Sequence, residues 1–135
     1  RERQVALGIQ LFQLMGIARE DTEKKIEWTK RGFRFFDAPA AIILSIDESM
    51  RDVAQFDIGT ITQTIALAAL HYELGTCIQG QGLMYPDVIR KFTGIPESKR
   101  LSINLAIGYP DWDFPANRVQ SEREPIEITT TWCGI

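Results

Sequence analysis

At 135 residues, with 44% apolar and 24% charged side chains, the chain has the size and composition of one ordinary globular domain. Its 15 Lys and Arg against 18 Asp and Glu give a net charge of -3 and no long basic block, which argues against a nucleic-acid partner. Apolar runs such as residues 38–44 and 65–70 are shorter than the roughly 20 residues of a membrane-spanning helix, so we expect no membrane partner.

The first part of the chain predicts two helices separated by a short break. Apolar residues recur at helical spacing over residues 5–15 and stop at Gly16. A second helix is expected to start near Thr22, and its charged stretch, residues 23–36, is typical of a protein surface. This helix must end before Pro39, because the residue before a proline is disfavoured in helical geometry.

The centre of the chain predicts a strand, a loop and a core helix. Residues 40–46 form a continuous isoleucine-rich run, typical of a strand covered on both faces. Residues 50–57 carry several acids and are predicted to be a loop. Residues 58–74 begin with polar residues and are then apolar nearly all round, which predicts a core helix that stops at Gly75.

A short strand and a glycine-rich turn follow that helix. Residues 76–79 are expected to form the strand, with Cys77 and Ile78 at its centre, and Gly80 follows directly with Gly82 two residues further. The turn therefore exposes bare backbone at the end of a buried scaffold, where a planar ligand could lie against the main chain. Two nearby glycines alone usually mark only a turn.

The last third predicts one more helix and two strands. Pro86 opens a short helix that Gly94 ends. The buried side of that helix is expected to carry Val88, Ile89 and Phe92. Residues 101–107 alternate between apolar and small or polar side chains, which predicts a strand with one face in the core. Residues 126–133 are rich in threonine and isoleucine, which favours a late strand.

Chemically reactive side chains are few, and each has a structural interpretation. Cys77 and Cys133 fit neither a CxxC pair nor a zinc-ligand spacing, so free thiols in a reducing cytoplasm are the simplest interpretation. His71 is expected to pack or cap a helix end rather than act as a base. The acids within residues 47–57 are expected to be a solvated loop rather than a metal site. For Trp112 and Phe114 three interpretations stay open: they line a substrate pocket, contact a partner subunit, or pack on the surface.

Several short pieces of the sequence occur in a characteristic order. They are Phe36-Asp37-Ala38-Pro39, Leu74-Gly75, Thr76-Cys77-Ile78-Gln79-Gly80, Gly94-Ile95-Pro96, Ala106-Ile107-Gly108-Tyr109-Pro110 and residues 117–125. No single piece is diagnostic. The ordered set resembles the nitroreductase family of flavin-dependent enzymes over nearly the whole chain.

The resemblance implies an α+β fold, a three-layer α/β/α sandwich whose small mixed or antiparallel sheet is flanked by helices. It also implies a homodimer in which a C-terminal arm, residues 126–135, is exchanged between subunits. Family members begin with a Ser-x-Arg-x-aromatic segment that helps to hold phosphate, and that segment is not found here. We therefore expect residues 1–135 to form a single nitroreductase-like domain that lacks its N-terminal segment.

The resemblance also implies a binding site for FMN. In the family, the backbone at the position of Gln79 and Gly80 faces the reactive edge of the flavin, and an amide there can bond the flavin N5. Gln81 continues this turn and is included in the cofactor-binding set. Arg123 matches the arginine that holds the FMN phosphate, a task that suits the forked guanidinium group. Ser121 completes the predicted set, at a position that is often basic in relatives. No catalytic side chain and no metal ligand is implied.

The implied activity is that of an FMN-dependent NAD(P)H oxidoreductase. The nicotinamide would reduce the flavin, and a small electron-poor acceptor such as a nitroaromatic or a quinone would then take the hydride. The alternative is a flavin-binding or interaction module of the same fold without turnover. A narrower option within the enzyme class is reductive dehalogenation or flavin breakdown. The sequence names neither the physiological acceptor nor the preferred nicotinamide.

Overall fold

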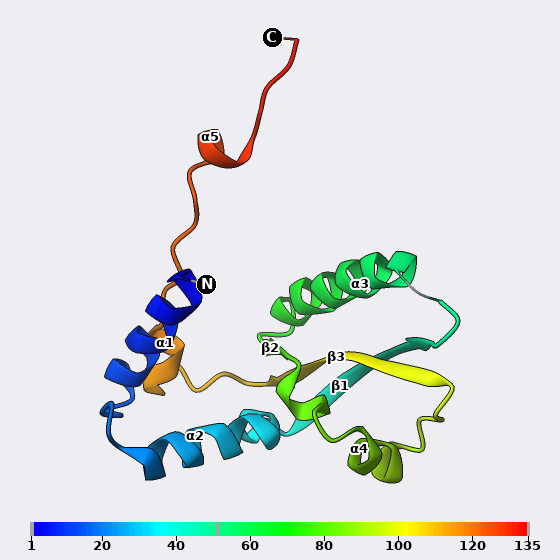
Figure 1. The fold of residues 1–135 in the computed structure, drawn as a ribbon, viewed down its shortest axis with the longest axis horizontal. Helices are drawn as coiled ribbons and strands as arrows, with labels where there is room; N and C mark the ends of the chain where they lie inside the picture. The colour runs from blue at the N-terminus through cyan, green and yellow to red at the C-terminus, as the bar shows by residue number, and fades with distance from the viewer. Residues whose placement is uncertain (1, 51, 135) are drawn as a thin grey trace. The chain divides into compact units, whose positions relative to one another are not determined.

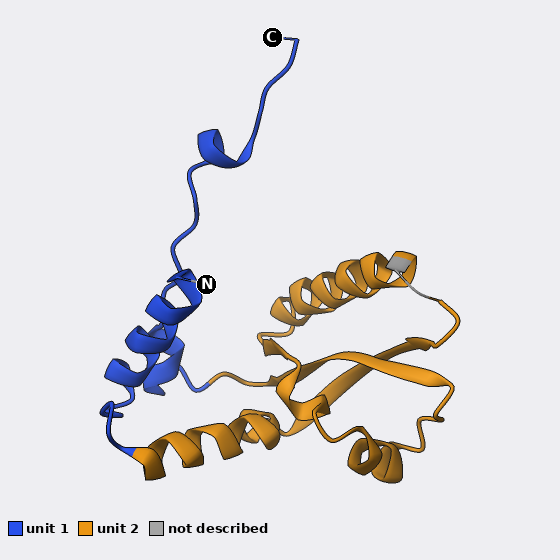
Figure 2. Cartoon of the chain, in the orientation of Figure 1, with its two compact units in different colours: residues 1–21, 111–135 blue, residues 22–110 orange. Residues whose placement is uncertain are grey.

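The computed structural model describes residues 2–50 and 52–134, which separate into two compact units. One unit is Thr22–Pro110, and the other combines the N-terminal segment up to Asp21 with the C-terminal segment from Asp111 (Figure 2). Each unit has its own helices, and the larger one contains the sheet. The larger unit therefore carries the glycine-rich turn, whereas Ser121 and Arg123 belong to the smaller one.

The sheet of the larger unit has three antiparallel strands in the order β1-β3-β2 (Figure 1). They are β1 (Ala40–Asp47), β2 (Gly75–Gln79) and β3 (Lys99–Gly108). The register of β1 against β3 shifts between Leu44 and Ser45, where the structure has a bulge or irregularity. The predicted strands 40–46, 76–79 and 101–107 are thus confirmed, and the sheet among the described residues is antiparallel rather than mixed.

Helices lie on both sides of this sheet, as Figure 1 shows. Helix α3 (Asp52–Leu70) contacts all three strands from one side. On the other side, β3 contacts two short 3-10 helices, η1 (Phe35–Asp37) and η2 (Gln81–Leu83), and α2 (Thr22–Phe33) packs on η2. Helix α4 (Pro86–Thr93) lies on this side as well. The predicted three-layer arrangement is confirmed.

Helix α3 differs from its prediction at both ends. It begins at Asp52, so the prediction of a loop over residues 50–57 was wrong for most of that stretch. The physical reason is a stripe of buried residues at helical spacing that starts before residue 58: Ala54, Thr62 and Ala69 are all buried. The helix also ends at Leu70 rather than at residue 74, and the left-handed residue Glu73 (φ 59°) turns the chain toward β2.

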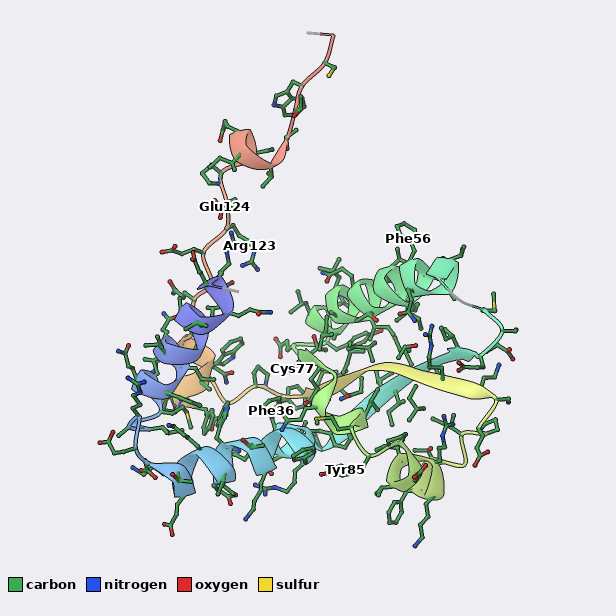
Figure 3. The ribbon with its side chains drawn as sticks, in the orientation of Figure 1. Phe36, Phe56, Cys77, Tyr85, Arg123 and Glu124 are labelled. Atoms are coloured by element: carbon green, nitrogen blue, oxygen red, sulfur yellow. The ribbon has the colours of Figure 1, made fainter. Side chains whose placement is uncertain are left out.

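The outer side of α3 is apolar and exposed, which corrects the prediction of an all-round buried helix. Val53 is 81% exposed and Phe56 is 75% exposed, with Leu67 and Leu70 further along the helix. Phe56 points away from the sheet in Figure 3. By length and composition alone, Val53–Leu70 could cross a membrane, with a mean hydropathy of 1.2, and it is longer than the apolar runs 38–44 and 65–70 considered in the sequence. The core helix of a soluble protein passes the same test. The contacts of α3 with the sheet indicate a packed helix with one uncovered face.

Strand β3 is covered on both faces at its centre, whereas the alternation predicted only one core face. Leu105 and its neighbours Asn104 and Ala106 are buried, and Asn104 is 0% exposed. Successive side chains of a strand point to opposite faces, so this burial requires cover on both sides. The cover comes from α3 on one side and from η1 and η2 on the other.

Helix α2 is shorter than predicted because the chain leaves helical geometry after Phe33. Three consecutive residues, Phe35, Phe36 and Asp37, have φ of 55°, 56° and 61°. For residues other than glycine this left-handed conformation costs about 1–2 kcal/mol each. Two ion pairs hold it, from Arg34 Nε to Asp37 Oδ1 and from Arg31 Nε to Asp37 Oδ2, both at 2.8 Å.

Asp37→Asn should destabilise the protein in a pH-dependent manner. The hydrogen bond from Arg34 and the charge of Arg31 hold the pKa of Asp37 below its usual value, against some opposing desolvation. A lowered folded-state pKa stabilises the protein above the unfolded-state pKa of about 3.9, and the effect is lost as pH falls through the folded-state pKa. Urea unfolding of both proteins from pH 7 to pH 2.5 should show a constant difference above about pH 5 that shrinks as the pH falls further. A difference that does not change with pH would contradict the assignment.

Helix α4 has its predicted ends but not its predicted burial. Pro86 starts it, and Gly94 follows it with a φ of 72°. Phe92 is 81% exposed and Val88 is also exposed, so of the three residues predicted for the buried side only Ile89 is partly buried. Arg90 ties the helix to the loop that follows, because its guanidinium donates to the carbonyls of Pro96 (2.5 Å) and Lys99 (2.7 Å), among others.

The smaller unit contains helix α1 (Glu2–Leu14), the 3-10 helix η3 (Pro115–Arg118) and the short helix α5 (Ile126–Thr129). The predicted first helix is confirmed, and Gly16 follows it with a φ of 62°. Helix α1 packs on η3, and Ile17 is buried. The prediction of a strand over residues 126–133 was wrong, since one helical turn is followed by irregular chain. The described residues of the smaller unit include no strand with which this segment could pair.

Candidate cofactor site

The central feature of the candidate site is the turn formed by residues 79–82, between β2 and η2. Gln79 is the last residue of β2, and Gly80 continues with ordinary backbone angles, φ -98° and ψ -17°. The carbonyl of Gly80 accepts a hydrogen bond from the Leu83 amide at 3.0 Å. The turn is therefore a hydrogen-bonded element of fixed geometry.

Gly80 faces open space. A Cβ atom built on Gly80 would meet no heavy atom within 4 Å, apart from its own chain neighbours. Because φ is negative, the backbone does not require glycine at this position. The absence of a side chain at Gly80 thus leaves a free backbone surface without serving the protein's own packing.

Gly82, two residues further, is enclosed by the protein. A Cβ atom there would lie 2.4 Å from Phe35 Cε1 and 3.2 Å from Asn104 Oδ1. The left-handed segment before β1 therefore brings the Phe35 ring directly onto the turn. The two nearby glycines therefore differ in their surroundings: Gly80 faces open space, and Gly82 is packed against the protein.

The side chain of Gln81 is directed to helix α2. Its Nε2 donates to the Thr29 carbonyl at 2.8 Å, and its Oε1 lies 2.0 Å from the position of a Cβ on Gly32. Gly32 is buried for this reason. Of the predicted cofactor residues, Gln81 thus offers only its backbone to a ligand in this conformation, and its side chain anchors the turn.

Three polar side chains of β2 and β3 have buried polar atoms, and two of these residues were missed in the sequence. The side-chain nitrogen and oxygen of Gln79, the same two atoms of Asn104, and Ser102 Oγ are buried without a hydrogen-bond partner among the described residues. A buried amide left unsatisfied costs about 1–3 kcal/mol, and native proteins contain few of them. Asn104 and Ser102 had the signal of polar residues within an apolar strand, but the alternating pattern predicts a solvent-facing position for such residues.

The other two predicted residues, Ser121 and Arg123, lie in the smaller unit. Arg123 is exposed, and its Nη1 donates to the Ser121 hydroxyl and to the Glu122 carbonyl at 3.2 Å. The neighbouring Glu124 is paired with Arg3 of α1 (Figure 3 labels Arg123 and Glu124). The structure thus brings Gln79, Gly80 and Gln81 together in one turn, and Ser121 and Arg123 together in one irregular segment.

The remaining reactive side chains take structural positions. His71 packs edge-on against Tyr72, with ring centroids 5.0 Å apart. Desolvation raises the pKa of the Cys77 thiol, which makes it less reactive, although the residue retains an exposed surface and is not a core thiol. Residues 2–50 and 52–134 contain no group of three His, Cys, Asp or Glu side chains that could hold a metal ion.

Comparison with known proteins defines the class of protein to which this fold and turn belong. A model described as the nitroreductase family matches residues 4–109. The chain is a member of the nitroreductase family. Its turn at residues 79–82 lies inside the matched region, whereas Ser121 and Arg123 lie outside it.

Two curated proteins illustrate the relationship. The chain is 28% identical to the 4-nitrobenzoate reductase of Nocardioides sp. (strain LMS-CY), over 98% of this chain and 55% of that protein. It is 30% identical to the nitrobenzene nitroreductase of Ectopseudomonas oleovorans, over 91% of this chain and 54% of that protein. The chain thus spans about half the length of the curated relatives it matches.

Solved structures confirm the predicted nitroreductase-like fold. The FMN and NADPH-dependent nitroreductase NfnB from Sphigopyxis sp. strain HMH matches with a TM-score of 0.92 and 28% identity, over 99% of this chain and 60% of that chain. The FMN-dependent nitroreductase NfnB from Mycobacterium smegmatis, solved in complex with NADPH, matches with a TM-score of 0.91 and 27% identity, over 98% of this chain and 60% of that chain.

Proposed function

We propose that the protein is an FMN-dependent oxidoreductase that uses NAD(P)H to reduce an electron-poor small molecule such as a nitroaromatic or a quinone. The observation that carries the proposal is the open backbone of Gly80, at the end of strand β2 in a nitroreductase fold. One structural relative named above is an FMN and NADPH-dependent nitroreductase and the other is an FMN-dependent nitroreductase solved with NADPH, which supports the choice of cofactor and reductant. The curated relatives are named for nitrobenzoate and nitrobenzene, which supports the class of acceptor.

The residues present fit FMN on two counts. Gly80 leaves backbone surface where a flat ring can approach the main chain, and the bound ring would supply the hydride chemistry. Arg123 is an exposed cation in a segment with a hydroxyl at Ser121, and a forked guanidinium is suited to phosphate oxygens. The chain's own part is to place the ring against residues 79–81 and to hold the phosphate with Ser121 and Arg123. In this scheme the protein needs no side chain that acts as a catalytic acid or base.

Reduction of bound flavin tests the proposal directly. The purified chain is mixed with FMN, separated from free flavin, and titrated anaerobically with NADPH while the visible spectrum is recorded. We expect a protein-bound flavin spectrum that bleaches with NADPH and returns when 4-nitrobenzoate is added. Bound flavin that NADPH does not bleach would favour the module without turnover, and a chain that binds no FMN would contradict both functions.

Arg123→Ala should weaken FMN binding if the guanidinium holds the phosphate. The loss of a hydrogen bond to a charged group is worth about 1.5–3 kcal/mol, or roughly 10-fold to 100-fold in the dissociation constant. Quenching of FMN fluorescence measures this change. Riboflavin, which lacks the phosphate, is the matched control, and its affinity should be the same for both proteins. An equal loss for riboflavin and FMN would show that Arg123 does not act on the phosphate.

A module without turnover is the second candidate function. The Ser121 hydroxyl accepts a hydrogen bond from Arg123, so the predicted phosphate contact contains one cation and one neutral residue that are already bonded to each other. Weaker phosphate binding of this kind favours a flavin carrier or interaction module over an efficient enzyme. The anaerobic titration separates the two functions.

We also propose that the protein is a homodimer, with both units part of one nitroreductase-like domain, and that it acts in the cytoplasm. The exposed apolar side of α3, which includes Phe56 and Leu67, is a candidate subunit interface, and the arm with Ile128 and Trp132 is equally exposed. Free thiols at Cys77 and Cys133 are consistent with a reducing compartment.

Leu67→Glu should convert the dimer into monomer, because a buried unpaired charge opposes assembly. Sedimentation velocity at several concentrations measures this change, and Glu73→Gln, at the exposed turn after α3, is the matched surface control. A variant that sediments as the native protein does would exclude this side of α3 from the interface.

A further inference from the structure

The buried side chains of Gln79 and Asn104 form one polar cluster on one face of the sheet. Gln79 and Asn104 are directly opposite each other in the pairing of β2 with β3. Opposite residues of antiparallel strands point to the same face, with Cβ atoms about 4.5–5.5 Å apart. Ser102 lies at the irregularity in the pairing of β3 with β1 and is not counted in this cluster. Gly82 lies over the cluster, since its missing Cβ would be 3.2 Å from Asn104 Oδ1.

The neighbours of this cluster do not satisfy its polar atoms. Each side-chain amide offers two N–H donors and one carbonyl acceptor. Above Asn104 lie the bare backbone of Gly82 and the apolar ring of Phe35. Buried polar groups that lack protein partners are usually satisfied by ordered water, which typically makes about three hydrogen bonds. The amides of Gln79 and Asn104 are placed to share such a water.

The cluster affects Gly80 because Gln79, the residue before Gly80, belongs to the cluster. The turn is held by the Gln81 side chain on α2 and by the Phe35 ring on Gly82. Gln79 is the remaining residue of the turn, and its side chain projects toward Asn104. If Gln79 is held there, the peptide between Gln79 and Gly80 is fixed, and with it the direction of the Gly80 amide.

We propose that Asn104 is a positioning residue of the cofactor site, which acts with Gln79 through a buried water to orient the Gly80 amide. This inference rests on the proposed function, because the Gly80 backbone amide is the group that the proposed function places against the flavin. It concerns Asn104, which touches neither cofactor nor substrate in this scheme. The water that links the side-chain amides of Gln79 and Asn104 is expected in the protein without any cofactor.

The first test uses the protein without flavin. In the native protein we expect nuclear Overhauser contacts between a long-lived water and the side-chain amide protons of Asn104 and Gln79. Asn104→Leu, an apolar replacement of similar size, should remove the Gln79 contact and shift the Gly80 backbone amide resonance. Leu105→Ala is the matched control, because it disturbs the opposite face of the same strand and should leave the Gly80 resonance in place. Water contacts that are absent in the native protein, or a Gly80 resonance that Asn104→Leu leaves unmoved, would overturn the inference.

The second test adds FMN to the same proteins. We expect Asn104→Leu to weaken FMN binding about tenfold, as for the loss of one well-placed hydrogen bond, and to shift the midpoint potential of the bound flavin. Leu105→Ala should shift neither property. If Asn104→Leu does not fold, Asn104→Ala removes the same amide without adding a branched side chain and should move the same resonance and potential in the same direction, and unchanged values would overturn the inference. A native protein that binds no FMN contradicts the proposed function, while the test without flavin still decides the role of Asn104.

Discussion

Replacing Gly80 with valine should abolish FMN binding and leave the stability of the fold unchanged. No protein atom lies within 4 Å of the added Cβ, and the φ of -98° suits any residue, so the folded chain accepts the side chain. The branched side chain would fill the space in which the flavin ring approaches the backbone. We expect FMN affinity to fall by more than about 100-fold, equivalent to about 2.7 kcal/mol. Fluorescence titration measures the affinity, and urea unfolding measures the stability.

Gly80→Ala provides a graded control for this experiment. One methyl group intrudes less than a branched side chain, so its loss of FMN affinity should lie between those of the native protein and Gly80→Val. Normal flavin loading in Gly80→Val would show that the ring lies elsewhere. A loss of affinity accompanied by a loss of folding would show that the open space beside Gly80 has another occupant in the native protein.

Replacing Gly82 with valine should, in contrast, destabilise the fold. A Cβ there would lie 2.4 Å from the Phe35 ring, and valine adds two more methyl groups in that crowded space. Overpacking of a core costs about 1–3 kcal/mol and occasionally more, so we expect a loss of about 3 kcal/mol in the free energy of unfolding. Urea unfolding monitored by circular dichroism measures this change.

A double-mutant cycle identifies the cause of that loss. Phe35→Ala removes the ring that a Gly82 side chain would meet, so the double variant Phe35→Ala/Gly82→Val should be more stable than the sum of the single effects predicts. Additive effects would mean that Gly82 is constrained by something other than Phe35. Together, the valine variants at Gly80 and Gly82 separate cofactor binding from folding within one four-residue turn.

The element boundaries that depend on local chemistry could be predicted from the sequence. Gly16 and Gly94 both follow helices with positive φ, and Pro86 begins α4. These effects act within one or two residues, because glycine tolerates left-handed backbone and proline fixes its own φ. The strand pattern of residues 101–107 was equally local, and β3 confirms it.

Features that depend on tertiary packing could not be predicted in the same way. The early start of α3 follows from burial of Ala54 against the rest of the larger unit, which no local signal marks. The left-handed run Phe35, Phe36 and Asp37 contains no glycine, and it is held by ion pairs to Asp37 and by the packing of Phe35 on Gly82. Right-handed backbone is favoured for residues other than glycine, and the surrounding contacts override that preference here.

The candidate site was predictable only in part. Resemblance to the family located the turn at Gln79 and Gly80, but the direction of the Gln81 side chain depends on Gly32, which is distant in sequence. Asn104 was missed because an alternating pattern assigns polar residues to the solvent. Its burial depends on the cover that η1 and η2 place over the strand.

The irregular pairing between Leu44 and Ser45 has a consequence for the behaviour of the protein at high concentration. Leu44 pairs with Ile103 and Ser45 pairs with Leu101, so the extra residue is Ser102 of the central strand β3. An extra residue of this kind bends its strand and increases the local right-handed twist. Strand β1, one of the two outer strands in the order β1-β3-β2, follows that twist along its paired length. A twisted edge matches a straight incoming strand poorly, so the irregularity opposes edge-to-edge aggregation along β1.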